Sequence, residues 1–301
     1  MKLSIGIDMG GTVVKAAAFS EDGEMLLQRN APTADGKKKK GQHAWAVHVR
    51  ELIRDMEGDL TQKADAIGMA CPGLPSRDRR SIACLSNRLP GLEHFDWTEW
   101  LERPMAIPVV NDAQAALLGE VWQGAAKGVQ NAVMLTLGTG VGGAILVDGR
   151  LLRGHIGRAG HLGHVSVDLH GEASIFGMPG ALECHIGNYN VHQRTGGRYF
   201  STKDLVIAVG QGNAEAMACW HRSVKALAVT IASLVNIVDP EVVILGGGIA
   251  QAGSLLWEPL DQHLSETEWR PLGGRVPIIP AALGEWAGTY GAAFDAMREM
   301  P

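Results

Sequence analysis

Cysteine is scarce in this chain, and its four copies show no metal-binding or disulfide pattern. Cys71, Cys84, Cys184 and Cys219 lie far apart, and none belongs to a CxxC pair. This spacing excludes the disulfide framework of a small secreted domain and is typical of reduced thiols. We therefore expect a cytoplasmic protein.

A surplus of positive charge and long apolar runs are also missing. The 301 residues carry a formal net charge of −5, whereas nucleic-acid-binding domains usually have a basic surplus. No apolar run reaches the roughly 18 residues that a spanning helix needs. The opening sequence MKLSIGIDMGG begins a strand at once and does not read as a signal peptide. We expect neither a nucleic-acid partner nor a membrane partner.

Glycine, in contrast, is abundant and is concentrated at the ends of predicted strands. The 39 glycines include clusters at residues 10–11, 138–143 and 246–248. Glycine lets a ligand come close to the backbone because it has no side chain. The clusters therefore indicate ligand-binding loops.

One pattern of elements occurs twice, near residues 3–29 and 131–152. Each copy reads as a strand, a glycine-rich turn, a second strand and a hairpin. Such an internal repeat predicts two similar α/β halves facing each other across a cleft. Apolar spacing also predicts helices in and around these halves, over residues 44–56, 113–122, 214–238, 254–263 and 287–299. We assign residues 1–113 with about 287–301 to one domain and residues 114–286 to the other.

Two hairpin turns combine glycine with threonine: Asp8-Met9-Gly10-Gly11-Thr12 and the turn over residues 137–143. Successive backbone N–H groups in such turns form a concave anion site, and threonine hydroxyls add donors. Neither turn is a Walker loop, because no GK[ST] follows, and neither is a Rossmann fingerprint, because each leads into a strand. Two such turns, with residues 246–248 after a third strand, predict a phosphate-binding site.

Asn111 and Asp112 follow an apolar run over residues 107–110 and precede an apolar helical pattern. A carboxylate at this junction can face a cleft and act as a general base. Asp and Asn are also the usual N-cap residues of helices. The pattern by itself leaves both interpretations of Asp112 open.

Five segments together resemble the ROK family of bacterial sugar kinases, which belongs to the actin-like sugar kinase/Hsp70 superfamily. In chain order they read DMGGTVVK, CPG, NDAQAALLGE, LGTGVGGAILVDGRL and DPEVVILGGGI. The resemblance implies an α/β fold of two actin-like (ribonuclease H-like) domains, with mixed sheets, flanking helices and a cleft between them. It also implies ATP and Mg²⁺ as cofactors, a sugar or polyol substrate, and a homodimer or homotetramer.

The resemblance further implies which residues hold the nucleotide. Asp8 would bind Mg²⁺ through water, because Mg²⁺ takes one or two carboxylates together with water and phosphate oxygens. Lys15 would neutralise phosphate charge, although an ordinary surface lysine explains this position equally well. The remaining positions are Gly10, Gly11 and Thr12 at the β- and γ-phosphates, Gly138, Thr139 and Gly140 in the second phosphate loop, and Gly246, Gly247 and Gly248 beside the adenosine.

On the sugar side, the resemblance implies that Asp112 is the general base, which accepts the proton of the attacking hydroxyl. Asn111 would contact sugar hydroxyls. Gly73, in the Cys-Pro-Gly turn, and Asn87 would border the same site. Arg88 is inserted directly after Asn87, however, and this departure from the family pattern leaves the place of Asn87 open.

The sequence Gly-His-Leu-Gly-His at residues 160–164 departs from the family's Gly-Glu-Ile-Gly-His, in which Glu and His both touch the sugar. His164 is retained, but His161 replaces the acid. A carboxylate accepts from two hydroxyls, whereas a neutral imidazole offers one donor and one acceptor. The substrate's hydroxyl pattern should therefore differ from that of glucose, unless His161 is only a surface residue.

Cysteine is also absent from residues 174–183, where most family members carry a Cys-x-Cys-Gly-x-x-Gly-Cys-x-Glu zinc loop. A structural zinc needs four nitrogen or sulfur ligands, so we predict no zinc here. We expect apolar packing by Ile175, Phe176 and Met178 to hold the loop instead. Glu183 is retained and should reach the sugar.

The leading hypothesis is thus an ATP-dependent kinase of a hexose or hexose-like substrate. The alternatives are a cyclitol or aminosugar kinase and a non-catalytic sugar-binding or sensing protein. A transcriptional regulator of this family would carry a winged helix-turn-helix domain before Asp8, which stands close to the start of this sequence. Retention of Asp8, Asp112 and both phosphate loops favours an enzyme. The hydroxyl that is phosphorylated stays open.

Overall fold

The computed structural model describes residues 2–85 and 88–300, which fall into two compact units. Unit 1 contains the chain up to Gly128, the segment Arg153–Ala159 and the chain from Ala282 onward. Unit 2 contains Val129–Leu152 and Gly160–Ala281. Asn87 lies outside the described residues, so its expected contact with substrate has no structural counterpart here.

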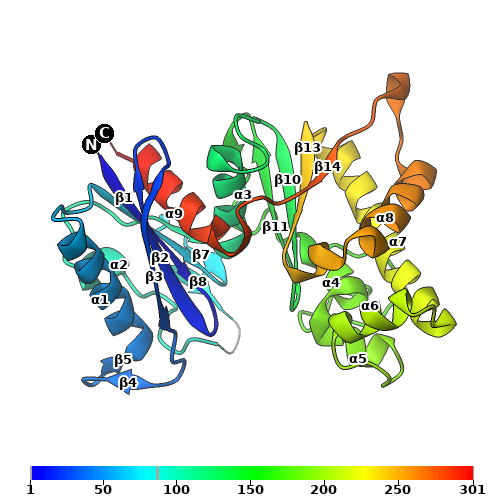
Figure 1. The fold of residues 1–301 in the computed structure, drawn as a ribbon, viewed down its shortest axis with the longest axis horizontal. Coiled ribbons are helices and arrows are strands. Elements are labelled where there is room, and N and C mark those ends of the chain that lie inside the picture. The colour runs from blue at the N-terminus through cyan, green and yellow to red at the C-terminus, as the bar shows by residue number, and fades with distance from the viewer. Residues whose placement is uncertain (1, 86–87, 301) are drawn as a thin grey trace. The chain divides into compact units, whose positions relative to one another are not determined.

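Unit 1 is built on a mixed sheet (Figure 1). Its strands are β1 (Leu3–Met9), β2 (Val13–Ser20), β3 (Met25–Pro32), β6 (Ala66–Cys71) and β9 (Val109–Asn111). Their order is β3-β2-β1-β6-β9, antiparallel from β3 to β1 and parallel from β1 to β9. The other elements of unit 1 are β4 (Lys38–Lys39), β5 (Gln42–His43), β7 (Leu74–Pro75), β8 (Ile82–Cys84), α1 (Ala44–Asp59), α2 (Trp97–Trp100), α3 (Asp112–Gln123), η5 (Gly284–Trp286) and α9 (Ala287–Arg298).

Unit 2 contains the second mixed sheet. Its strands are β10 (Ala132–Leu137), β11 (Val141–Val147), β12 (Arg150–Leu151), β13 (Val242–Gly246) and β14 (Ile278–Pro280), in the order β12-β11-β10-β13-β14. The helical elements of unit 2 are η1 (Leu162–His164), α4 (Leu182–Ile186), η2 (Asn188–Asn190), α5 (Val191–Arg194), α6 (Thr202–Gly210), α7 (Ala214–Val238), η3 (Gly248–Ala252), α8 (Ser254–Thr267) and η4 (Pro271–Gly273).

The two sheets have the same pairing scheme. β10 pairs antiparallel with β11 and parallel with β13, as β1 does with β2 and β6. The internal repeat predicted from the sequence is therefore confirmed, and so is the α/β class with two mixed sheets and flanking helices. β6 and β13 are buried along their whole length, as expected for parallel strands that are covered on both faces.

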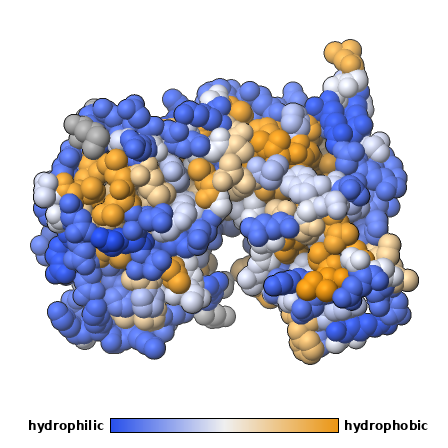
Figure 2. Space-filling view, viewed as in Figure 1, coloured by the Kyte–Doolittle hydropathy of each residue, from blue (hydrophilic) through white to orange (hydrophobic). Residues whose placement is uncertain are grey.

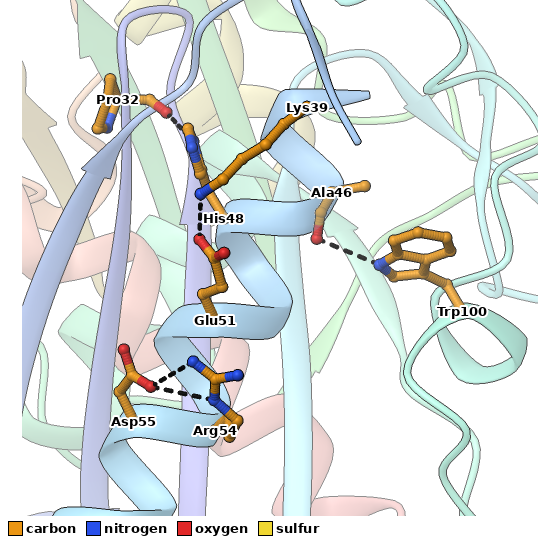
Figure 3. Close-up of polar contacts among 8 residues, drawn as sticks. All are labelled: Pro32, Lys39, Ala46, His48, Glu51, Arg54, Asp55 and Trp100. Atoms are coloured by element: carbon orange, nitrogen blue, oxygen red, sulfur yellow. Dashed lines mark hydrogen bonds and ion pairs between the residues drawn. The ribbon is translucent and has the colours of Figure 1, made fainter. Parts of the chain in front are cut away.

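Helix α1 lies against β2 and β3 with one apolar face. Trp45, Val49, Ile53 and Met56, spaced three or four residues apart, are all buried, as the periodicity predicts. Polar contacts join the helix to its surroundings at other points (Figure 3). These are Lys39 Nζ to Glu51 Oε2 at 2.6 Å, His48 Nδ1 to the Pro32 carbonyl at 2.7 Å, and Trp100 Nε1 to the Ala46 carbonyl at 3.1 Å.

Helices α3 and α9 pack together closely enough that only glycine fits at their contact. A Cβ added to Gly291 would lie 1.7 Å from the Ala115 carbonyl oxygen, and one on Gly119 would lie 2.5 Å from that of Ala287. This packing places α3 in unit 1, whereas the sequence-based boundary after residue 113 assigned that helix to the other domain. The expected return of the C-terminal helix to the first half is seen in α9, which lies against β1 and β6.

Glu120 fixes the chain where it returns to unit 1 ahead of α9. Its carboxylate is fully buried and accepts from the backbone N–H groups of Ala125 at 2.8 Å, Ala282 at 3.0 Å and Leu283 at 2.9 Å. Buried charge is tolerated when such hydrogen bonds satisfy it. Glu120 belongs to the segment NDAQAALLGE, but the sequence did not reveal this anchoring role.

Helix α7 forms the centre of the core of unit 2. The predicted range 214–238 agrees with the structure, and Val224, Leu227 and Ile231 are fully buried. The Asn213 side chain accepts from the Ala216 N–H at 2.9 Å and caps the helix. Sequence periodicity missed α6 and the short helices α4 and α5, because elements of four to nine residues show too few turns to establish a period.

Among the described residues, no helix is long and apolar enough to cross a membrane. One apolar projection is nevertheless exposed in unit 2. The segment between α8 and β14 extends away from the rest of the unit, and Figure 2 shows apolar atoms at its tip. Leu272 is fully exposed there, and Trp269 is 70% exposed.

Candidate active site

Asn111, and not Asp112, caps helix α3. The Asn111 Oδ1 atom accepts from the Ala113 N–H at 3.0 Å, and Gln114 Oε1 accepts from the Asn111 N–H at 3.3 Å, which completes a capping box. Asp112 is the first residue of the helix, and its side chain is exposed. Asp112 is therefore not the N-cap residue, although its Oδ1 atom also accepts from the Ala113 N–H at 2.8 Å, and its carboxylate stands at the end of β9.

Gly73 and Asn111 are in direct contact, as their shared role in the predicted site requires. The Asn111 Nδ2 atom donates to the Gly73 carbonyl at 3.1 Å. Gly73 has φ of +101°, and an added Cβ would lie 2.6 Å from the Cys84 carbonyl oxygen. Asn111 is buried, and the cap and this bond use its side-chain oxygen and one amide N–H. The amide has two donors, so one N–H is left for a substrate hydroxyl.

Asp8 lies near Asp112 in unit 1, since β1, β6 and β9 are neighbours in the sheet. Burial and the charge of Asp112 raise the pKa of Asp8 to about 7, although Lys15 opposes the shift. The N-terminal turn of α9 packs on the same carboxylate, where a Cβ on Gly288 would lie 2.7 Å from Asp8 Cγ. Two neighbouring carboxylates fit a divalent cation, because its charge would relieve their repulsion.

The first glycine-rich turn, at Gly10, Gly11 and Thr12, joins β1 to β2 in a tight hairpin. The Gly10 N–H donates to the Val13 carbonyl at 3.1 Å, and the Thr33 hydroxyl donates to the Gly10 carbonyl at 2.6 Å. Thr12 is exposed. Arg88 lies directly over the turn, because a Cβ on Gly11 would be 1.8 Å from Arg88 Nη2.

Lys15 has a partner in the segment that precedes α9. Its Nζ lies 2.9 Å from Glu285 Oε2 and donates to the Glu285 carbonyl at 3.0 Å. The ammonium also lies 5.8 Å from the centre of the Trp286 ring. These contacts favour the interpretation of Lys15 as a structural surface residue, with a secondary effect on the pKa of Asp8.

The second glycine-rich turn borders a pocket of about 530 Å³ within unit 2. The Gly138 and Thr139 carbonyls accept from the N–H groups of Asn188 at 3.0 Å and Tyr189 at 2.9 Å. The pocket brings both residues together with Gly248. Its other lining residues, which the sequence did not indicate, are Asn188, Thr202, Lys203, Val206, Ile207, Ile249, Gln251 and Ala252. Apolar walls with a few polar groups are typical of a site for a nucleoside.

The three glycines at 246–248 have different environments. Gly246 ends the buried strand β13, and only Gly248 lines the pocket. Gly247 has φ of +86° and ψ of 171°, a conformation that is essentially restricted to glycine. Its added Cβ would lie 2.3 Å from the Leu137 carbonyl oxygen. Gly247 therefore shapes the strand end, and Gly248 is the member placed to meet a ligand.

His164 and Glu183 face each other in unit 2. His164 Nδ1 lies 3.4 Å from Glu183 Oε1, yet both atoms are buried and form no hydrogen bond among the described residues. Glu183 Oε2 lies 3.0 Å from the position of a Cβ on Gly140. Buried polar atoms are nearly always paired. In the part of the chain that the structure describes, these two atoms have only each other at ion-pair distance, and they lie beside the second glycine-rich turn.

His161 joins this pair, so it is not an isolated surface residue. Its ring lies nearly parallel to that of His164, with centroids 6.3 Å apart and an interplanar angle of 16°. Gly163 makes this arrangement possible, because any larger residue would collide with the Val141 carbonyl, 2.1 Å from an added Cβ. The structure thus groups His161, His164 and Glu183, as the sequence predicts.

The loop that lacks the zinc cysteines is held by Ser174 and its backbone. The buried Ser174 hydroxyl accepts from the Phe176 and Met178 N–H groups at 3.2 and 3.3 Å. Phe176 packs its ring edge on His164, with centroids 4.7 Å apart. Ile175 is 74% exposed and Met178 40% exposed. The expectation of apolar packing is thus wrong for Ile175 and Met178, because hydrogen bonds of the turn hold the loop instead.

Comparison with known proteins identifies the family of this chain. The model of the ROK family matches residues 4–299. The chain belongs to the ROK family. Relatives of this ROK protein include a glucokinase of Thermotoga maritima, 32% identical, and an N-acetylmannosamine kinase of Escherichia fergusonii, 31% identical. The alignments cover 96% and 98% of this chain and 95% and 99% of the relatives.

Solved structures of the family have the same fold as this ROK protein. The ROK hexokinase of Thermus thermophilus superposes with a TM-score of 0.87 at 31% identity, covering 99% of this chain and 98% of that chain. A ROK glucokinase of Streptomyces griseus, solved in complex with glucose and AMPPNP, gives a TM-score of 0.76 at 26% identity, with 98% and 99% covered. The fold is therefore that of the ROK sugar kinases, which is actin-like.

Proposed function

We propose that this ROK protein is an ATP-dependent kinase that phosphorylates a hydroxyl of a hexose or hexose-like sugar. The observation that carries the proposal is the division of labour at the start of α3. Asn111 is the N-cap residue of the helix, and the Asp112 carboxylate is exposed at the strand end near Asp8, where one of its oxygens also accepts from the Ala113 N–H at 2.8 Å. A pure helix start would need only one of these two residues.

The reaction assigns one role to each group in unit 1. Asp112 accepts the proton of the attacking sugar hydroxyl while the oxygen bonds to the γ-phosphorus. The bond from that phosphorus to the β–γ bridging oxygen breaks, and ADP leaves. Asp8 would hold Mg²⁺ through water, and this cation would supply charge neutralisation on the phosphates. Gly11 and Thr12 offer backbone and hydroxyl donors to the same phosphates, while the Gly10 N–H closes the turn on the Val13 carbonyl.

In unit 2, the 530 Å³ pocket is assigned to the adenosine, with Gly138, Thr139 and Gly248 at its edge. Gly140 stands beside Glu183, which together with His164 would bind sugar hydroxyls. His161 beside them supplies a donor where the family pattern has an acceptor-only carboxylate. An N-acetylated or amino sugar is the second candidate substrate, because its nitrogen substituent offers other hydrogen-bond donors and acceptors than a hydroxyl does. In addition, a relative named N-acetylmannosamine kinase is similar over 98% of this chain.

The proposal includes four further properties that the sequence suggested. The chain acts in the cytoplasm, uses ATP and Mg²⁺, binds no structural zinc and forms a homodimer or homotetramer. Support for the zinc prediction is the content of the loop at residues 174–183, which supplies no cysteine and is closed by Ser174. Exposed Trp269 and Leu272 in unit 2 support association of copies, because exposed apolar groups often mark protein contacts.

A coupled assay of ADP release tests the proposal across glucose, mannose, fructose, N-acetylmannosamine, N-acetylglucosamine and inositol. We expect turnover with at least one hexose or aminosugar, dependent on Mg²⁺. Turnover with inositol alone would change the substrate class to a cyclitol. If no substrate is turned over although AMPPNP and a sugar both bind, the non-catalytic sensing function is the correct one.

A further inference from the structure

A second cavity, of about 300 Å³, lies entirely within unit 1 and has no role in the proposed reaction. Its walls come from the β7–β8 turn, the segment Arg153–Ala159 and the beginning of α3. The side chains that give it character are Arg77, Arg79, Arg153, His155 and Gln114. Three guanidinium groups around one small cavity give it strongly basic walls.

The neighbouring carboxylates neutralise only part of this charge. Arg79 pairs with Asp295 and Glu299 of α9, and Arg153 Nη2 lies 3.5 Å from Asp295 Oδ1. Asp78, in the same turn, accepts from the Ser76 hydroxyl at 2.6 Å. These ion pairs explain why Arg79 is fixed. They leave the charge of Arg77 unbalanced by any ion pair in the part of the chain that the structure describes.

Two side chains of the cavity have hydrogen-bond donors without an acceptor among the described residues. The Arg77 guanidinium forms no hydrogen bond in that part of the chain. Gln114 uses its Oε1 for the capping box, so its amide N–H₂ group remains a donor. The N-terminal turn of α3, whose dipole favours anions, lies alongside.

We propose that this cavity binds the phosphate group of a small dianion, either orthophosphate or a phosphate monoester. Guanidinium groups match phosphate oxygens in pairs of hydrogen bonds, and an anion offsets the charge of Arg77 and adds to the 3.5 Å pairing of Arg153 with Asp295. A volume of 300 Å³ holds a phosphate with a small organic group. The site is separate from Asp112, although Gln114 links it to the capping box that positions Asn111.

Isothermal titration calorimetry at low ionic strength tests this proposal with orthophosphate and with glucose 6-phosphate as probes. The variants are Arg77→Gln and Arg153→Gln, and Arg79 is left intact because Asp295 depends on it. Arg54→Gln is the matched control for charge, because Arg54 lies on the surface of α1 and, among the described residues, pairs only with the adjacent Asp55 (Figure 3). We expect the Kd to rise by about tenfold or more in each cavity variant and to stay unchanged in the control.

If one probe binds more tightly than the other, that probe shows whether the cavity takes orthophosphate or a phosphate monoester. Tighter binding of either probe supports the site. Equal Kd values in all four proteins would show that the anion binds elsewhere, for example at the glycine-rich turns, and would overturn the proposal. Absence of binding by both probes would overturn it too. Arg77→Gln should keep the Tm of the parent protein, because Arg77 makes no ion pair among the described residues.

A different observation concerns Arg88, which the sequence inserts into a family motif. Its Nη2 lies against Gly11, at 1.8 Å from the position of an added Cβ. Lys15, the cation expected at these phosphates, is instead paired with Glu285. No hydrogen bond or ion pair joins Arg88 to any residue within 2–85 and 88–300. An exposed guanidinium therefore stands at the turn where phosphate charge would arrive.

We infer that Arg88 contacts the transferred phosphate and supplies the positive charge that Lys15 does not. This inference rests on the proposed function. An arginine at a transferred phosphoryl group stabilises the charge of the transition state. Arg88 would lie beside Gly10 and Gly11 and contact the oxygens of the transferred phosphoryl group. The sugar hydroxyl attacks this group when Asp112 accepts its proton.

Steady-state kinetics and AMPPNP titration of Arg88→Gln and Arg88→Lys test this contact, with Arg54→Gln as control. We expect kcat to fall by about 10- to 100-fold in Arg88→Gln, with partial recovery in Arg88→Lys and unchanged KM for the sugar. An active parent whose Arg88→Gln variant keeps full kcat and AMPPNP affinity would refute the role of Arg88 alone. An inactive parent would refute the proposed function, while weaker AMPPNP binding by Arg88→Gln would still support the contact.

Discussion

The two glycine-rich hairpins occupy the same place in their sheets but differ in charge. In unit 1, Asp8 stands two residues before the first glycine of the turn, near the carboxylate of Asp112, and Arg88 lies over Gly11. In unit 2, Thr136 stands at the corresponding position before Gly138. The second turn uses its backbone, because its carbonyls accept from Asn188 and Tyr189.

This difference shows how one repeated scaffold serves two tasks. The charged hairpin can hold a cation and the phosphates to be transferred, which demand charge. The neutral hairpin can form the edge of an apolar pocket for a nucleoside, which demands shape and a few polar groups. The repeat sets where a ligand meets the backbone, and a few side chains near each turn set which ligand it is.

Asp112→Asn should have the largest effect, because it removes the proposed base from unit 1 and keeps a side-chain oxygen that can accept from the Ala113 N–H. We expect kcat to fall by about 10²- to 10⁴-fold, while the Tm stays close to that of the parent because Asn111 still caps α3. The coupled ADP-release assay and a thermal melt measure both quantities. Near-normal turnover would show that Asp112 is not the general base. The charge difference between the hairpins would then have no demonstrated role in catalysis.

The sequence predicted the repeat, the sheets and most long helices, because apolar periodicity and glycine clusters are local signals. It also indicated that His161, His164 and Glu183 belong together, through a motif resemblance. It could not assign the cap between Asn111 and Asp112, since both residue types suit that position. That decision depends on the Gly73 carbonyl, which is brought in by a neighbouring strand.

Contacts between distant segments account for what the sequence did not show. Glu120 is an ordinary helical glutamate until residues 282–283 present their N–H groups to it. Arg88 reads as an irregular insertion until the fold places it on Gly11. The residues that the sequence did not indicate in the proposed nucleoside pocket come from α6, η2 and η3, short elements that carry no strong periodic signal.

Gly247→Ala should destabilise unit 2 by about 2–4 kcal/mol, because Gly247 has a glycine-only conformation and its added Cβ meets the Leu137 carbonyl oxygen. Gly248→Ala is the matched control, since an added Cβ there meets no atom within 4 Å. It should leave stability within about 1 kcal/mol of the parent and weaken AMPPNP binding. Urea denaturation and calorimetry measure the two effects. Equal stability of the two variants would contradict the separate roles of these glycines.

Asp8→Asn tests the charge of the first hairpin through pH. The folded-state pKa of about 7 lies above the ordinary value of 3.8, so the folded state binds this proton more tightly than the unfolded state. The stability that this bound proton contributes to the folded state is present below about pH 4 and is lost as the pH rises through 7. Without Mg²⁺, the variant should therefore gain Tm relative to the parent between pH 4 and pH 8.

Thr136→Val, at the matching position in unit 2, is the control for that measurement and should show no such change with pH. Addition of Mg²⁺ with AMPPNP should stabilise the parent and not Asp8→Asn, because bound ligand favours the folded state. If the Tm difference between Asp8→Asn and the parent does not vary with pH, the pKa of Asp8 is not raised in the folded state. The two hairpins would then differ less in their electrostatics than their sequences suggest.

Ser174→Ala should have the smallest effect, in the loop that replaces the family's zinc site. Loss of a buried hydroxyl that accepts from the Phe176 and Met178 N–H groups should cost about 1–2 kcal/mol, and the sugar KM should rise because Phe176 packs on His164. Ile175→Ala serves as control, since its side chain is 74% exposed. A larger Tm loss in Ile175→Ala would show that apolar packing holds the loop after all. A stoichiometric zinc content of the purified parent would show that a metal holds the loop. Unit 2 would then depend on a bound cation, as we propose for unit 1.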